Sequence, residues 1–299
     1  MIAKNAYSSY STLFGIQQKA KAYVQLMKMR LSMLVVFSAG MAYILGAAVV
    51  DWRHFMIFCV GGLLVTGAAN TINQMLEVDY DKLMKRTMNR PLPTKRLSMT
   101  EAGIFSIVTG GLGIFLHVMY INPFTGILSF LSLMLYAFAY TPLKRVGPIA
   151  VFVGALPGAL PPLIGWVAAT SAISYEALIL FGIQFIWQFP HFWAIAWVGY
   201  DDYKKAGYEL LPSKGGRDLN TAFNIMIYTL FLIPISLLPA LAGVTGKTSA
   251  VIVTIAGVLF LIQTFLLMKR CDQKAALWMM FGSFLYLPIV QIAFVADKL

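Results

Sequence analysis

Nine stretches of about twenty mostly apolar residues dominate this sequence of 299 residues. A hydrocarbon core about 30 Å thick needs roughly 20 apolar residues in each helix that crosses it. Charged residues make up only 12% of the chain, whereas soluble domains carry about 25%. The sequence therefore predicts an all-α, polytopic membrane protein. The expected transmembrane helices cover residues 31–50, 55–77, 101–119, 123–141, 147–169, 177–199, 222–243, 248–268 and 276–296.

The net charge of +11 could suggest a nucleic-acid partner, but the positions of the basic residues argue against one. Nine crossings would place twenty of the 23 Lys and Arg residues on the same side of the membrane. An excess of basic loop residues on one side marks the cytoplasmic side. We therefore expect no nucleic-acid partner. We also expect the protein to lie in a bacterial-type cytoplasmic (inner) membrane, with the N-terminus and these loops in the cytoplasm. The loops lie near residues 78–100, 142–146, 200–221 and 269–275.

The acidic residues gather in or beside two of these loops, which follow the expected second and sixth helices. Glu77 and Asp202, one in each loop, are 125 positions apart, and the basic pairs that begin at Lys144 and Lys269 have the same spacing. This spacing favours a repeat, and the two acidic loops would form cytoplasmic helix-loop caps. We expect one transmembrane domain over residues 1–299, built from four-helix pseudo-repeats at about 25–145 and 147–270 plus a ninth helix at about 276–296.

Three polar residues at the end of the expected second helix share one helical face. Asn73, Glu77 and Asp81 are spaced i, i+4 and i+8, so they lie within about 80° of one another and span about 12 Å. Two carboxylates and a carboxamide at a membrane surface are costly unless they are paired or functional. Oxygen ligands of this kind suit Mg²⁺, which completes its coordination shell with water and substrate phosphates. The stripe predicts a site for one or two Mg²⁺ ions.

Basic residues follow the stripe at once and could neutralise a polyphosphate. Lys85, Arg86 and Arg90 lie within ten positions of Asp81, and a guanidinium can bind phosphate oxygens in a bidentate manner. The same charges could instead form a surface salt-bridge network, although that alternative leaves Asn73 unexplained. Lys144 and its neighbour Arg145 are interpreted equally well as topology markers or as phosphate partners.

This segment resembles the first signature of the UbiA superfamily of intramembrane prenyltransferases. Most members carry Asp where this chain has Glu77, a change that keeps the charge and lengthens its reach. The matching residues read Asn73-xxx-Glu77-xxx-Asp81-xx-Met84-x-Arg86-Thr87-xx-Arg90-Pro91.

Further segments are similar to one branch of that superfamily, the protohaem IX farnesyltransferases or haem O synthases. The resemblance extends over nearly the whole chain, and the combined motifs are far more specific than the acidic stripe alone. The matching segments are 140–145, 154–166, 187–194 and 202–212.

The resemblance implies a UbiA-type helical bundle and a Mg²⁺-dependent transfer of the farnesyl group from farnesyl diphosphate to a vinyl group of haem B. The product would be haem O, which a downstream haem A synthase could use. For metal binding and catalysis, the hypothesis assigns Asn73, Glu77, Asp81 and Asp202. For diphosphate binding it assigns Lys85, Arg86, Arg90, Lys144, Arg145 and Lys204. For the haem acceptor it assigns His191, Trp187, Tyr203, Lys28 and Arg30.

Several alternatives remain open from the sequence. The acceptor could be an aromatic ring, as in quinone-pathway prenyltransferases, or the chain could be an ion-coupled transporter. His191 lies in an apolar, aromatic run, where a structural core histidine is the ordinary interpretation. The second acidic motif is compressed to Asp201-Asp202, which leaves the number of metal ions open. His54 and His117 are interpreted as structural.

Overall fold

The computed structural model describes residues 17–299, of which residues 17–26 form a helix ahead of the bundle. Within these residues, nine helical segments are long and apolar enough to cross a membrane. This confirms the predicted number of spans and the all-α class. The only β pairing in the described part of the chain is an isolated bridge between Thr245 and Lys298. The expected cytoplasmic N-terminus, with Lys4, lies outside the described residues.

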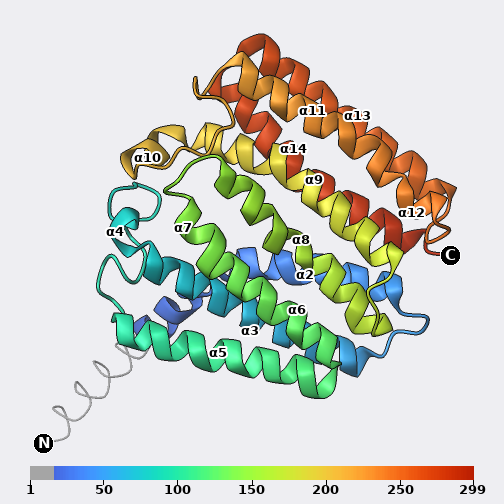
Figure 1. Ribbon diagram of the computed structural model, residues 1–299, viewed down its shortest axis with the longest axis horizontal. Coiled ribbons are helices and arrows are strands. Elements are labelled where there is room, and N and C mark those ends of the chain that lie inside the picture. Colours follow the sequence, from blue (N-terminus) through green and yellow to red (C-terminus); the bar gives the residue numbers. More distant parts are fainter. Residues whose placement is uncertain (1–16) are drawn as a thin grey trace, which may run out of the picture.

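Seven of the nine spans in residues 17–299 are single helices, packed as an antiparallel bundle (Figure 1). Their ends lie within four residues of the predicted ends, because the length of an apolar run sets the length of a membrane helix. They are α2 (Met29–Gly46), α3 (Trp52–Leu76), α5 (Met99–Tyr120), α8 (Ile149–Thr170), α9 (Tyr175–Val198), α13 (Lys247–Arg270) and α14 (Gln273–Ala296).

The span expected at 123–141 changes its helical geometry before its end. It begins as α6 (Pro123–Met134), widens into a π-helix (Leu135–Tyr140) and ends as α7 (Thr141–Leu143). In the wide turn both the backbone N–H and the hydroxyl of Thr141 donate to the carbonyl of Tyr136. Such π segments occur frequently at functional sites, and here the segment carries the chain into the acidic end of the bundle.

The span expected at 222–243 is also divided. It forms α11 (Leu219–Ser236) and the short α12 (Leu238–Leu241). Pro239 has no N–H to donate to the carbonyl four residues earlier, and its ring would collide with that carbonyl in a regular helix. The break at Leu237 therefore follows from the proline.

Helix α8 lies at the centre of the bundle, where it packs against α2, α6 and α9, and most of its residues are buried. Small residues let membrane helices approach closely. Gly165 of α8 shows this plainly, because a Cβ there would overlap the carbonyl oxygen of Ala39 in α2. The backbones of α2 and α8 are therefore in direct contact.

Three prolines inside α8 remove backbone N–H groups from the helix: Pro157, Pro161 and Pro162. The carbonyls four residues before the last two would lack a hydrogen-bond donor in lipid, where an unsatisfied group costs several kcal/mol. Neighbouring helices supply the donors. Ser132 of α6 donates to the carbonyl of Pro157 at 3.4 Å, and Gln184 of α9 donates to that of Gly158 at 2.8 Å.

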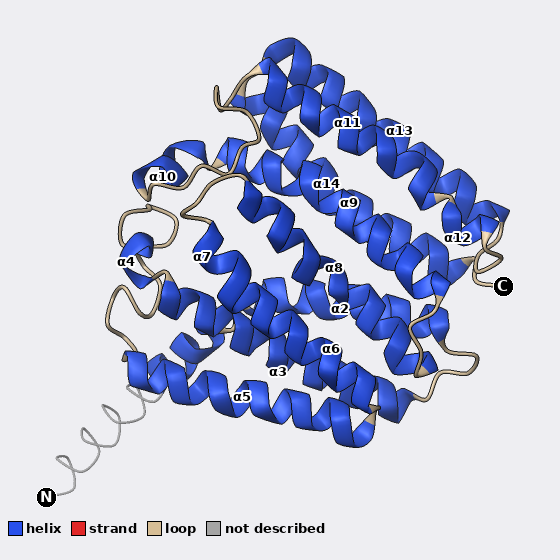
Figure 2. Cartoon of the chain, in the orientation of Figure 1, coloured by secondary structure: helices blue, strands red, loops and turns tan. Residues whose placement is uncertain are grey.

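The longer connections lie at one end of the bundle, beside α4 (Val78–Asp81) and α10 (Tyr200–Lys205) (Figure 2). They join each other there, because the backbone N–H of Arg86 donates to Asp202 at 3.2 Å. The opposite end is closed by short turns, where Asn122 caps α6 and also donates to the carbonyl of Val167 at 3.0 Å. The two predicted acidic loops thus form a cap on the same end of the molecule.

Candidate active site

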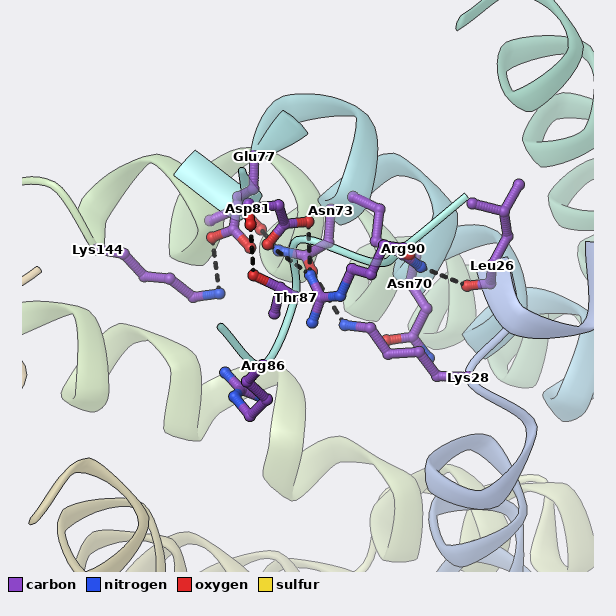
Figure 3. A network of polar contacts seen from close by, with 12 residues as sticks. Leu26, Lys28, Asn70, Asn73, Glu77, Asp81, Arg86, Thr87, Arg90 and Lys144 are labelled. Atoms are coloured by element: carbon purple, nitrogen blue, oxygen red, sulfur yellow. Dashed lines mark hydrogen bonds and ion pairs between the residues drawn. The ribbon is translucent and has the colours of Figure 1, made fainter. Parts of the chain in front are cut away.

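The predicted polar stripe lies at the capped end, where α3 runs into α4. The side chains of Asn73, Glu77 and Asp81 point the same way and are almost entirely buried (Figure 3). The helical progression continues through the break at Glu77, since the backbone N–H of Glu77 donates to the carbonyl of Asn73 and the backbone N–H of Asp81 donates to the carbonyl of Glu77. The structure thus confirms that the three residues share one face.

Glu77 forms an ion pair with Lys144, at 2.8 Å between Oε1 and Nζ. The hydroxyl of Tyr208 also donates to Oε1, at 3.4 Å. Burial alone would raise the pKa of Glu77, but the ammonium group of Lys144 overcomes it and holds the pKa below its ordinary value. The same pairing raises the pKa of Lys144 despite its burial. Both groups are therefore charged at neutral pH.

Asp81 has no exposed side-chain surface, and both its oxygens accept from Nη1 of Arg90, at 2.7 and 2.8 Å. Burial raises the pKa of Asp81 above its ordinary value, although the guanidinium of Arg90 opposes the shift. The hydroxyl of Thr87 donates to the backbone carbonyl of Asp81 at 2.9 Å. This bond folds the loop back, so that Arg90 can reach the carboxylate.

Asn73 connects the stripe to two other segments. Its Oδ1 accepts from Nζ of Lys28 at 3.2 Å, and its Nδ2 donates to the hydroxyl of Thr141 at 3.1 Å. Burial lowers the pKa of Lys28 well below its ordinary value, and the positive charges of Arg90 and Lys144 add to the effect. The sequence assigned Lys28 to the acceptor, whereas the structure places it against the predicted metal ligand Asn73.

Asp202 lies beside this group rather than in it. Its Oδ1 pairs with Lys205 at 3.0 Å, and this hydrogen bond is the main reason why its pKa lies below the ordinary value. Arg86 contacts α10 twice, through its backbone N–H to Asp202 and through Nη2 to the hydroxyl of Tyr203 at 3.3 Å. In residues 17–299 no three His, Cys, Asp or Glu side chains come close enough to share a metal ion, so Asp202 stays apart from the buried carboxylates.

The other predicted site residues are not brought into the stripe. Lys85, Lys204 and Arg30 are exposed. Arg145 donates to the carbonyl of Leu76 at 2.9 Å and stacks on Tyr80, which satisfies the end of α3. Their roles in diphosphate or acceptor binding stay predictions.

His191 and Trp187 lie within α9 and contact α14 instead of the stripe. Nδ1 of His191 is 2.9 Å from Oγ of Ser283, and Nε1 of Trp187 donates to the carbonyl of Ser283 at 3.0 Å. The two rings are stacked, with centroids 4.2 Å apart. These contacts form a second polar position inside the bundle, and acceptor binding there stays a prediction.

Sequence reasoning missed three residues at these sites. Tyr208 and Thr141 contact the stripe, and Ser283 contacts His191. Thr141 lies in the quoted 140–145 motif, so the resemblance offered a signal for it. Tyr208 lies in the quoted 202–212 segment, so the resemblance offered a signal for it as well, whereas nothing in the sequence pointed to Ser283.

The stripe holds more basic than acidic side chains. Three basic side chains, Lys28, Arg90 and Lys144, face the carboxylates of Glu77 and Asp81 (Figure 3). A buried charge without a partner is costly, which is why burial and the neighbouring cations lower the pKa of Lys28. An anionic ligand would favour the charged form of all three groups. The arrangement therefore suits an anion that several cations can hold at once, such as a diphosphate.

Residues 33–286 match the UbiA prenyltransferase family. A protein named protoheme IX farnesyltransferase from Cytophaga hutchinsonii is 54% identical over 280 residues, which covers 93% of this chain and 98% of that protein. A protein of the same name from Christiangramia forsetii is 45% identical, with 92% and 93% covered.

Solved structures give the same fold. A digeranylgeranylglyceryl phosphate synthase has a TM-score of 0.78 and 21% identity, and the match covers 93% of this chain and 98% of that one. A UbiA homologue from Archaeoglobus fulgidus bound to DMAPP and Mg²⁺ has a TM-score of 0.69 and 15% identity, with 92% and 99% covered. At these identities the likeness extends to the arrangement of the helices alone.

Proposed function

This chain belongs to the UbiA prenyltransferase family, and we propose that it transfers the farnesyl group of farnesyl diphosphate to a vinyl group of haem B, giving haem O. The family match and the relatives named protoheme IX farnesyltransferase support the reaction. The observation that carries it is the buried stripe at Asn73–Asp81, which combines oxygen ligands with an excess of basic side chains.

The residues of the stripe fit Mg²⁺. Asn73, Glu77 and Asp81 offer oxygen donors, which this hard cation prefers, and Oε2 of Glu77 has no hydrogen-bond partner within residues 17–299. When bound, Mg²⁺ supplies positive charge that stabilises the diphosphate as a leaving group. The UbiA homologue from Archaeoglobus fulgidus is described with DMAPP and Mg²⁺. Asp202, which lies beside the stripe, would hold a second ion.

The basic side chains exchange partners as substrate binds. In the free protein Arg90 and Lys144 are held by Asp81 and Glu77, and a diphosphate would draw them to its own oxygens. Arg86, which lies between the stripe and α10, would close over it. Cations placed where negative charge develops stabilise the transition state without reorganisation.

The reaction breaks the C–O bond of the allylic diphosphate, and the electron pair leaves with the diphosphate. The π electrons of the haem vinyl group form the new C–C bond to the allylic carbon. Water then attacks the remaining carbocation and loses a proton, which leaves the hydroxyl group of haem O. The apolar bundle excludes water until the carbocation has been captured.

The acceptor positions are assigned from the sequence and their placement. His191 and Trp187 form the inner position on α9, and Tyr203 lies beside Arg86. Arg30 is a candidate partner for the haem propionates, whereas Lys28, which the sequence also assigned to the acceptor, lies in the stripe and would bind the diphosphate. We infer that the capped end faces the cytoplasm of a bacterial inner membrane, because the basic residues gather in its loops. Haem O made there would pass to a haem A synthase.

The test uses purified protein in detergent with haem B, farnesyl diphosphate and Mg²⁺. Extracted haems are analysed by mass, and we expect a product heavier than haem B by one farnesyl group and one hydroxyl group. A parallel reaction offers 4-hydroxybenzoate in place of haem B. Prenylation of the aromatic acid with no haem O would replace haem as the acceptor, and no transfer to either acceptor would refute the proposed function.

A further inference from the structure

His191 and Trp187 are both fixed by one residue of the neighbouring helix. Ser283 of α14 is fully buried; its hydroxyl lies 2.9 Å from Nδ1 of His191, and its carbonyl accepts from Nε1 of Trp187. The indole of Trp187 packs against the face of the imidazole ring. The orientation of the imidazole is therefore set by contacts on two of its sides.

The hydrogen bonds also decide which nitrogen of His191 carries the proton. The hydroxyl of Ser283 has a single proton and donates it to the carbonyl of Met280 at 2.6 Å. If that proton pointed to His191 instead, two oxygen lone pairs would face each other at this short distance. Nδ1 of His191 is therefore the N–H donor to Ser283, and Nε2 carries the lone pair. Within residues 17–299, Nε2 has no hydrogen-bond partner.

His117 provides a comparison within the same bundle. Its Nδ1 lies 2.8 Å from the hydroxyl of Ser129, and its Nε2 lies 3.0 Å from the carbonyl of Phe58. Both nitrogens of this buried ring are occupied, as expected for a structural histidine. His191 differs, because only one nitrogen is occupied and the ring is only partly buried.

His191 lies on α9, a helix that also lines a small cavity inside the bundle. Gln184 is seven residues earlier, which is about two helical turns on the same face. Gln184 lines a small cavity between α2, α9 and α14, together with Ser38 and Gln291. His191 lies about 10 Å from the capped end of α9 at Val198, taking 1.5 Å per residue. Along the axis of α9, His191 therefore lies between the level of that cavity and the end of the bundle that holds the stripe.

We propose that Nε2 of His191 coordinates the iron of haem B while the vinyl group is farnesylated. This inference rests on the proposed function. A neutral imidazole with its other N–H bonded to a fixed acceptor is the usual form of a histidine that ligates a metal, and histidine is a common haem ligand. Ser283 is a positioning residue, since it holds the tautomer and the ring. Only an Fe–N bond forms in this step, and no proton or electron is transferred.

Coordination of the iron would keep the same edge of the porphyrin facing the prenyl diphosphate in every turnover. The haem ring is large and apolar, so burial alone would let it rotate or slide within the bundle. An iron ligand on α9 fixes its centre, and the vinyl groups at its edge then reach the prenyl carbon within a limited set of orientations. Holding reactants in this way contributes to the rate of a bimolecular step.

The test titrates purified protein with haem B and, separately, with metal-free protoporphyrin IX. We expect the wild-type protein to show the absorption spectrum of a histidine-ligated haem. His191→Ala should lose that spectrum and bind haem B more weakly by at least the tenfold or so that loss of a ligand's hydrogen-bond partner causes, with unchanged affinity for the metal-free porphyrin. Added imidazole should restore the spectrum. His54→Ala, which removes an exposed histidine, is the control for surface binding of haem.

Ser283→Ala tests the positioning role. The ring would then be free to exchange tautomers, so haem B affinity should fall by about tenfold. Ser236→Ala is the matched control, because it also removes a buried serine hydroxyl, one that bonds Tyr286 at 2.9 Å, and it should leave the spectrum unchanged. If His191→Ala does not fold, His191→Met should fold and give a thioether-ligated spectrum.

Two results would overturn the coordination by His191. One is a His191→Ala protein whose haem spectrum equals that of the wild type. The other is an equal loss of affinity for haem B and for the metal-free porphyrin, which would show that the ring serves packing alone. Haem O formation by the wild-type protein separates the two hypotheses. Wild-type protein that makes no haem O refutes the proposed function, whereas haem O formation together with either of those results refutes only the iron contact.

Discussion

Replacing Arg90 with glutamine would leave the most deeply buried carboxylate of the site without its cation. Asp81 has no exposed side-chain surface, and both its oxygens accept from Arg90. Breaking a buried ion pair from one side is strongly destabilising because the remaining charge stays buried. We expect Asp81 to avoid that state in Arg90→Gln by taking up a proton when the protein folds.

The free energy needed to protonate Asp81 sets the size of the stability loss in Arg90→Gln. An aspartate ordinarily has a pKa of about 3.9, which is about 3 units below pH 7. At about 1.4 kcal/mol per unit, protonating it at pH 7 costs about 4 kcal/mol. Burial already raises the pKa of Asp81 in the wild-type protein. In Arg90→Gln the folded-state pKa is raised further, so stability is greatest below the unfolded pKa and is lost as pH rises toward the folded pKa. The variant should regain about 1.4 kcal/mol for each pH unit between 7 and 5.

The assay is chemical unfolding of detergent-purified protein at pH 5, 6 and 7, without substrate. Asp81→Asn combined with Arg90→Gln removes both charges, so we expect most of the stability to return and the pH slope to disappear. Haem O formation should remain lost in the double variant, since both the metal ligand and the phosphate partner are gone. Lys95→Gln is the matched control in the same loop, because Lys95 is exposed, and its effect should stay within about 0.5 kcal/mol at every pH.

Two outcomes would contradict this reasoning. A loss of stability in Arg90→Gln that does not change with pH would mean that packing, not the buried charge, is the cause. A double variant no more stable than Arg90→Gln would mean that Asp81 and Arg90 are not coupled.

Three further predictions concern other parts of the molecule. Lys28→Met should stabilise the substrate-free protein by about 1 kcal/mol, because it removes a buried amine whose pKa burial has lowered, and it should weaken farnesyl diphosphate binding measured by calorimetry. Lower stability with unchanged binding would count against a role of Lys28 in binding the diphosphate. Gly165→Ala should lower the free energy of unfolding by about 1–3 kcal/mol, because the added Cβ meets the backbone of Ala39, whereas the Cβ of Gly182→Ala meets nothing within 4 Å and should have no such effect. Equal effects of the two substitutions would exclude close helix contact as the cause. Chelation by EDTA should stop haem O formation and added Mg²⁺ should restore it, while haem B binding followed by its absorption stays unchanged; turnover that persists in EDTA would exclude the metal.

The sequence predicted features that depend on neighbours along the chain. The nine spans follow from the length of apolar runs, and the common face of Asn73, Glu77 and Asp81 follows from helical periodicity. Periodicity could also have distinguished the two lysines after Asp202. Lys205 is at i+3 and pairs with it, whereas Lys204 is at i+2, a spacing that does not bring side chains together.

Contacts between distant segments could not be predicted in this way. Lys28 meets Asn73 across 45 positions, Thr141 meets it across 68, and Tyr208 meets Glu77 across 131. The packing of whole helices sets these pairs, and no local pattern encodes it. The two four-helix pseudo-repeats, and the roles of Lys85, Arg145 and Lys204, stay predictions.

The proline-containing helix at the centre of the bundle has a consequence for biogenesis. Two carbonyls of α8 find their donors on α6 and α9, so α8 alone would enter lipid with part of its backbone unsatisfied. Ser132 precedes α8 in the chain, but Gln184 follows it and is synthesised later. Integration of α8 into the bilayer is therefore completed only when α9 arrives beside it, which makes these two segments a single unit of insertion.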